Sequence, residues 1–245
     1  MLAELMAETG RAVLKGVPPD GRSYWAARFW DRDSAERHSI LADDFLRQKE
    51  TIAGYMSGYG AESERALEFA CGTGEFTRLV AERTGVRKIT ALDISAQGLE
   101  LARQRVEHED LELVLGDFWQ DNGLKPADLV LCIDAIHHLG DVRQVLRRLK
   151  SFVEPGGTFI GNVWIADHFH EFQRKRYGAL EHFGRTALFL STALMIRASG
   201  GRLRTGSYRT QLLRSAEVEK ILAEEFSEVL EVKVERYFMG FVCRP

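Results

Sequence analysis

A glycine turn with an acidic residue downstream is the first feature of the sequence that could do chemistry. Gly72 and Gly74 follow the apolar run at 66–70 and precede a stretch with helical spacing. Glycine has no Cβ and tolerates positive φ, so such a turn lets a ligand approach the backbone. Asp93 ends the next apolar run, about 20 positions on, where a carboxylate can accept hydrogen bonds from both ribose hydroxyls. This spacing predicts a nucleoside site, with a plain helix cap at Asp93 as the alternative.

A second acidic signal follows the third apolar run, where Gly116, Asp117 and Phe118 stand together. We expect Asp117 to accept a hydrogen bond from an exocyclic adenine amine, while Phe118 or Ile94 covers the ring. A simple turn is the alternative for this Gly-Asp pair. Glu68, inside the first apolar run, is a carboxylate that needs a partner when buried, and a cationic ligand would supply one.

A histidine pair, His137 and His138, comes directly after the fourth apolar run. Ligands of open α/β sheets bind at the carboxyl ends of the strands, and an imidazole there titrates near neutral pH. Both histidines are therefore candidate general bases. The alternative is that the pair only orders the loop.

An aromatic cluster near the N-terminus contains Tyr24, Trp25, Phe29 and Trp30. We interpret it as a lid that excludes water and covers a cation through its ring faces, with Tyr24 near the substrate. Core packing on a helix is the alternative.

Basic residues concentrate at 164–214, where nine arginines and lysines stand against three acidic residues. Part of this segment would close over the site and present arginine, whose planar fork suits a carboxylate or phosphate. Arg174 and Arg197 are the candidates for binding an anionic substrate. A solvated helix face or a dimer surface is the alternative.

Short apolar runs that alternate with amphipathic stretches predict an α/β fold with a mostly parallel sheet. The expected strands are 66–70, 88–93, 111–115, 128–134, 158–163, 229–234 and 237–243, and the expected helices of this region are 75–83, 96–107, 142–152 and 215–225. The last strand would be antiparallel, completing a Rossmann-like seven-stranded sheet. We expect one domain over 1–245, with a helical cap at 1–62, a cofactor-binding core at 63–163, a substrate-side insertion at 164–214 and the end of the core at 215–245.

The bulk composition is that of an ordinary globular protein, with 45% apolar and 28% charged residues. The net charge of -3 gives no general attraction to nucleic acid or to an acidic membrane. Neither a signal peptide nor a membrane-spanning stretch is evident. The three cysteines lack metal-ligand spacing, so we expect reduced thiols, no metal and a cytoplasmic protein.

The motifs together resemble those of the class I S-adenosylmethionine-dependent methyltransferases. The first motif of that family, Glu/Asp-x-Gly-x-Gly-x-Gly, stands here as Glu68-x-Ala70-x-Gly72-x-Gly74. The resemblance implies S-adenosylmethionine as cofactor, with Glu68, Ala70 and Gly72 along its methionine part and Asp134 near its ammonium. The cofactor-binding residues expected in full are Glu68, Ala70, Cys71, Gly72, Gly74, Asp93, Ile94, Gly116, Asp117, Phe118, Ile133, Asp134, Trp25 and Trp30.

The function that this resemblance implies is methyl transfer to an oxygen, nitrogen or carbon of a small molecule, in a monomer or homodimer. Three alternatives stay open: a protein or RNA methyltransferase, a cyclising protein, and a protein that binds the cofactor without catalysis. A nicotinamide dehydrogenase is the nearest other enzyme class. It is disfavoured because that class needs a third glycine where this chain has Thr77.

Overall fold

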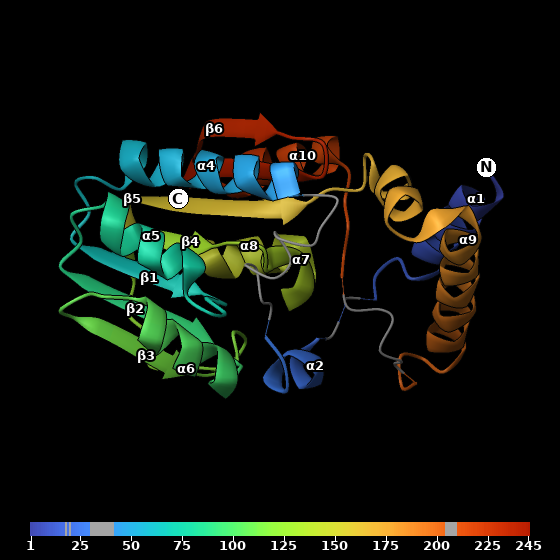
Figure 1. The fold of residues 1–245 in the computed structure, drawn as a ribbon, viewed down its shortest axis with the longest axis horizontal. Coiled ribbons are helices and arrows are strands. Elements are labelled where there is room, and N and C mark those ends of the chain that lie inside the picture. The colour runs from blue at the N-terminus through green and yellow to red at the C-terminus, as the bar shows by residue number, and fades with distance from the viewer. Residues whose placement is uncertain (18, 20, 30–41, 204–209) are drawn as a thin grey trace.

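The computed structural model describes residues 1–17, 19, 21–29, 42–203 and 210–245. Its described residues build a sheet flanked by helices and, beyond the carboxyl ends of the strands, a separate pair of helices (Figure 1). Trp30 lies outside the described residues, as do residues 204–209 of the expected insertion.

The sheet of the described chain has seven strands in the order β3-β2-β1-β4-β5-β7-β6. Their bounds are β1 Arg65–Phe69, β2 Lys88–Asp93, β3 Leu111–Leu115, β4 Ala127–Cys132, β5 Val153–Trp164, β6 Glu228–Val234 and β7 Phe238–Arg244. Neighbours pair in parallel except at β7, which is antiparallel to both β5 and β6. The predicted mostly parallel sheet with an antiparallel last strand is confirmed.

Helices cover both faces of this sheet, because successive side chains of a buried strand point to opposite sides. In β4, Leu129 and Leu131 face a core shared with α4 and α5, whereas Val130 and Cys132 face a core shared with α8 and α10. The helices of these layers are α4 Ala42–Tyr59, α5 Glu75–Arg83, α6 Ala96–Arg105, α8 Val142–Lys150 and α10 Ser215–Glu225.

The remaining helices lie at or beyond the carboxyl ends of the strands (Figure 1). Their bounds are α1 Leu2–Val13, α2 Arg22–Ala26, α7 Ile136–Leu139 and α9 Phe169–Ala198. We call α1 and α9 together the α1/α9 lobe; Leu14, Ala193 and Ile196 form its small core. Helix α9 is kinked at Gly178, where φ is 79° and ψ is 166°. No helix of the described residues is long and apolar enough to cross a membrane.

The helices of residues 1–62 do not stay together as a cap over the sheet. Helix α1 packs against α9 in the lobe, whereas α4 belongs to the helical layer on β5 and β7. Helix α2 lies by itself near the strand ends (Figure 1).

Two strand ends differ by more than one residue from the sequence-based expectation. Strand β5 begins at Val153, because its pairing with β4 continues across an irregularity between Ala127 and Leu129. The sequence Glu154-Pro155-Gly156-Gly157, typical of a turn, therefore lies within the strand, and Gly156 there has a φ of +82°. Strand β4 ends at Cys132, because Asp134 takes a left-handed φ of 57° that leaves the extended conformation.

Candidate active site

A cavity of about 1320 Å³ lies between the carboxyl ends of the strands, α2 and the α1/α9 lobe. Small-molecule sites usually have about 300–1,000 Å³, so this volume exceeds what one ligand needs. Both the glycine turn and the histidine pair line it. The cavity can therefore hold two small molecules side by side.

The glycine turn after β1 contains three residues with a left-handed backbone conformation. Ala70, Gly72 and Gly74 have φ values of 55°, 55° and 77°. A Cβ added to Gly72 would meet nothing within 4 Å, so this residue leaves open space on the cavity side. A Cβ on Gly74 would lie 2.8 Å from the Cβ of Ala102, so the glycine allows α6 to pack closely against the turn. Gly74 does not line the cavity.

Asp93 joins this turn to the second strand. Its Oδ2 accepts a hydrogen bond from the Gly72 N–H at 2.8 Å, and its Oδ1 accepts one from the Ser95 N–H at 2.7 Å. Burial raises the pKa of Asp93, although these two backbone donors act in the opposite direction. Each carboxylate oxygen keeps lone-pair capacity for a ligand hydroxyl at the cavity wall.

Glu68 lies beneath the cavity rather than on its wall. Its side chain is 2% exposed and accepts a hydrogen bond from the Thr77 hydroxyl at 2.5 Å. Burial raises the pKa of Glu68 to about 7, the Thr77 hydrogen bond lowers it in part, and Asp93 adds to the increase. The partner of this carboxylate is thus Thr77, the residue at the position of the missing third glycine.

Asp117 lines the cavity near the end of β3 together with Gly116, Phe118 and Ile94. Its Oδ1 accepts a hydrogen bond from the Trp119 N–H at 2.8 Å, and its Oδ2 lies 3.7 Å from Arg22 Nη1. The Phe118 ring packs edge-on against the buried ring of Phe69, and this contact fixes its orientation.

Asp134 is held by two amide side chains that the sequence analysis did not single out. Gln48 of α4 donates to its Oδ1 at 2.5 Å, and Asn162 of β5 donates to the same oxygen at 3.0 Å. The Asp134 N–H in turn donates to Asn162 Oδ1 at 2.6 Å. The Oε1 atom of Gln48 is buried without a hydrogen-bond partner in the protein.

The histidine pair divides into a buried and a partly exposed ring. His137 is 2% exposed, its Nδ1 accepts a hydrogen bond from the Trp164 N–H at 3.4 Å, and burial lowers its pKa well below the usual value. His138 lies beside it, 4.3 Å between ring centroids, and its Nδ1 is 3.0 Å from the Thr210 hydroxyl. Both line the cavity.

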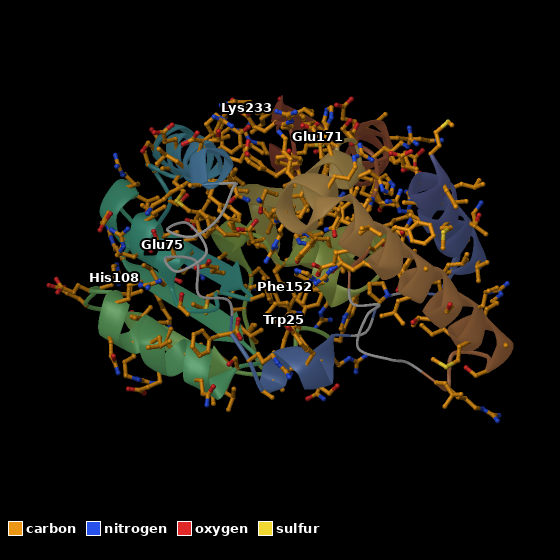
Figure 2. All side chains as sticks on the ribbon, turned by 45° about the vertical axis from the view of Figure 1, so that its right-hand side comes forward. Trp25, Glu75, His108, Phe152, Glu171 and Lys233 are labelled. Atoms are coloured by element: carbon orange, nitrogen blue, oxygen red, sulfur yellow. The ribbon has the colours of Figure 1, made fainter. Side chains whose placement is uncertain are left out.

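Helix α2 brings Tyr24 and Trp25 to the cavity. The Trp25 ring lies 5.1 Å from the His138 ring, and the Tyr24 ring meets it edge-on at 5.0 Å. Figure 2 shows Trp25 on the side of α2 that faces the body of the molecule. Its Nε1 is buried without a partner, so it offers a donor next to the histidine pair.

The predicted arginines are not brought to the cavity. Arg174 is absent from its lining and forms an ion pair with Glu4 of α1, and Arg197 is also absent from the lining. Arg176 and Arg185 of the same helix line the cavity instead. The described residues hold no cluster of three or more potential metal ligands.

The predicted residues that the structure gathers at one cavity come from separate parts of the chain. They are Tyr24, Trp25, Ala70, Cys71, Gly72, Asp93, Ile94, Gly116, Asp117, Phe118, Ile133, Asp134, His137 and His138. Nothing in the local sequence around Gln48 or Asn162 signals their place beside Asp134.

Comparison with known proteins finds a match in the middle of the chain. Residues 67–159 match the family model of a methyltransferase domain. Among solved structures, DhpI, determined in complex with S-adenosylhomocysteine (SAH), has the same fold with a TM-score of 0.59, 20% identity, and coverage of 91% of this chain and 94% of that one. Residues 67–159 are therefore similar to a methyltransferase domain, and the chain shares the fold of DhpI.

Curated relatives are similar over part of the chain. The malonyl-[acyl-carrier protein] O-methyltransferase of Priestia megaterium is 26% identical over 43% of this chain and 38% of its own length. The trans-aconitate 2-methyltransferase of Rhizobium leguminosarum is 35% identical over 38% of this chain and 36% of its own length. The chain therefore spans less than half the length of these two relatives.

Proposed function

We propose that this protein transfers the methyl group of S-adenosylmethionine to an oxygen, nitrogen or carbon atom of a small molecule. The observation that carries this proposal is the glycine turn, tied by Asp93 and open toward a cavity large enough for a donor and an acceptor. A small acceptor that bears an anionic group would suit the basic part of the lining.

The residues present fit this cofactor. The open space at Gly72 admits a ligand to the backbone, and Asp93 and Asp117 offer oxygens to ribose hydroxyls and to an adenine amine. Asp134 supplies a carboxylate for an ammonium group, and the unpartnered Oε1 of Gln48 lies on the side chain that holds Asp134. A third glycine, which a pyrophosphate ligand would require, is replaced by the buried Thr77.

When bound, the cofactor would supply a methyl group on a positively charged sulfur, open to in-line displacement. The chain would then hold the acceptor atom in line and exclude water, which accounts for most of what this reaction requires. Trp25 closes the cavity on the α2 side and contacts His138.

Of the two histidines, His138 is the better base for an acceptor hydroxyl or ammonium. The Trp164 N–H is a donor, so His137 Nδ1 is the acceptor in their hydrogen bond and its one proton is on Nε2. His137 therefore has no free nitrogen to take up a proton. Its burial keeps it neutral, and its ring packs against His138.

Isothermal calorimetry with SAH and, separately, with NADH tests the proposal. We expect SAH to bind and NADH not to bind. Replacing Asp117 by Ala should weaken SAH binding by at least about 10-fold, because a hydrogen bond to a charged group contributes about 1.5–3 kcal/mol.

Asp121→Ala is the matched control, because Asp121 belongs to the same loop and bonds the Gly123 N–H outside the cavity lining. It should bind SAH like the parent protein. Binding of NADH in preference to SAH would overturn the proposal. Turnover of S-adenosylmethionine to SAH with an acceptor then distinguishes an enzyme from a protein that only binds the cofactor.

A further inference from the structure

Acidic and basic side chains of the cavity lining gather at opposite ends of the cavity. Among the described residues, the strand end carries four aspartates, Asp93, Asp117, Asp134 and Asp141, and two arginines, Arg22 of α2 and Arg28 just after that helix. Glu75 also lies there, but it forms ion pairs with Lys49 and Arg78. The lobe end carries five basic residues, Arg11, Lys15, Arg176, Arg185 and Arg214, against Glu8 and Glu217. The two ends therefore suit ligand groups of opposite charge.

An aromatic wall connects the two ends. The Trp164 ring, at the end of β5, lies 5.9 Å from the Phe45 ring and 5.9 Å from the Phe172 ring. Arg176, one turn further along α9, has its guanidinium 5.8 Å from the Phe172 ring centroid. An apolar body that lies along this wall would reach the guanidinium of Arg176.

Two guanidinium groups at the basic end pack on one tyrosine ring. Arg176 and Arg185 lie over the ring of Tyr177, at 5.1 and 3.7 Å from its centroid. The kink at Gly178 separates the two halves of α9 from which they come. Arg185 pairs with Glu181, whereas no described carboxylate forms an ion pair with Arg176.

Two further observations at this end point to a ligand. His182 is 2% exposed, lines the cavity, and has an Nδ1 without a partner in the protein, while its Nε2 is 3.2 Å from His170 Nδ1. Burial lowers the pKa of Arg11 and Arg214 adds to the decrease, whereas Glu8 and Glu217 act in the opposite direction. With five basic residues and two glutamates, this end of the described lining has an excess of positive charge.

We propose that the α9 end of the cavity is an anion subsite for the methyl acceptor, with Arg176 and Arg185 as the binding residues. The acceptor class is an amphipathic anion: an apolar body along Trp164 and Phe172 and a carboxylate, phosphate or similar group at the far end. This proposal rests on the proposed function, because it assigns the strand end of the same cavity to the methyl donor. A guanidinium fork binds such groups in two parallel hydrogen bonds.

Calorimetry on the protein saturated with SAH tests this subsite with two probes, naphthalene-2-carboxylate and naphthalene-2-carboxamide. They share one apolar body and differ by a single charge. We expect the carboxylate to bind about 10-fold tighter, as a charge-assisted hydrogen bond predicts. Arg176→Gln should reduce that preference to about 2-fold, since Arg185 remains.

Arg174→Gln is the matched control, because Arg174 is on the same helix, two residues away, but pairs with Glu4 outside the cavity lining. It should keep the full preference for the carboxylate. The proposal would be overturned if the two probes bound with equal affinity, or if neither bound at millimolar concentration. It would also be overturned if both variants lost the preference for the carboxylate to the same extent. The Kd for SAH, measured first, reports folding and tests the proposed function separately.

Discussion

Glu68 is a carboxyl group that folding removes from water and leaves with one hydrogen bond, from Thr77. Its folded pKa of about 7 exceeds the usual value of 4.5, so the folded state binds the proton more tightly than the unfolded state. This favourable effect on stability is fully present below pH 4.5 and is lost as the pH rises through about 7. The residue therefore makes the apoprotein less stable in neutral and alkaline solution.

Replacing Glu68 by Gln should remove that dependence on pH, because an amide of the same shape does not titrate. Relative to E68Q, the parent should lose on the order of 3 kcal/mol of unfolding free energy between pH 4.5 and 8. Urea denaturation across this range measures the difference. Glu82→Gln, an exposed glutamate of α5, is the control and should leave the pH profile of the parent unchanged. If the unfolding free energies of E68Q and the parent changed with pH in the same way, the raised pKa of Glu68 would be contradicted.

At the scale of elements, the junction of β1 and α5 contains a strained residue. Ala70 has a φ of 55°, a conformation that costs a residue with a Cβ about 1–2 kcal/mol. Glycine would avoid this cost but loses about 0.5–1 kcal/mol more than alanine through backbone entropy. The family motif with glycine at this position thus has a local physical reason here.

Ala70→Gly should accordingly raise the unfolding free energy by up to about 1 kcal/mol, or the Tm by about 2–4 °C for a chain of this size. Differential scanning fluorimetry is sufficient to detect such a change. The control is Ala91→Gly in the fully buried, extended middle of β2, which should lower the Tm. A lower Tm for A70G would show that the turn is not strained at this residue.

Elements with a clear period were predictable from the sequence. Strands β2 and β3 and helices α5 and α10 have the expected bounds, because alternation and 3.6-residue spacing are local signals. The contacts of Asp134 with Gln48 and Asn162 were not predictable, since they depend on how α4, β4 and β5 pack. The choice of Arg176 rather than Arg174 at the cavity likewise depends on the rotation of α9 about its axis.

At the scale of the whole molecule, the two ends of the cavity belong to different cores. The glycine turn, Asp93 and Asp117 are supported by the sheet, whereas Arg176 and Arg185 are supported by α9 and its packing on α1. Figure 2 shows α9 crossing in front of the molecule from the sheet side to the far end of the lobe. A change confined to the contact of α1 with α9 should therefore affect the two regions unequally.

Gly10→Val tests this separation. A Cβ on Gly10 would lie 2.6 Å from Cε1 of Phe189, so valine must displace that ring from the lobe core. Overpacking of this kind costs about 1–3 kcal/mol. We expect faster amide hydrogen exchange in α1 and α9 and a loss of the preference for naphthalene-2-carboxylate, while the Kd for SAH stays within about 2-fold.

Gly184→Ala, where an added Cβ meets nothing within 4 Å, is the control and should keep both properties. Equal weakening of SAH and carboxylate binding in G10V would mean that the sheet and the lobe respond as one unit, and the division of the cavity between two cores would then be wrong.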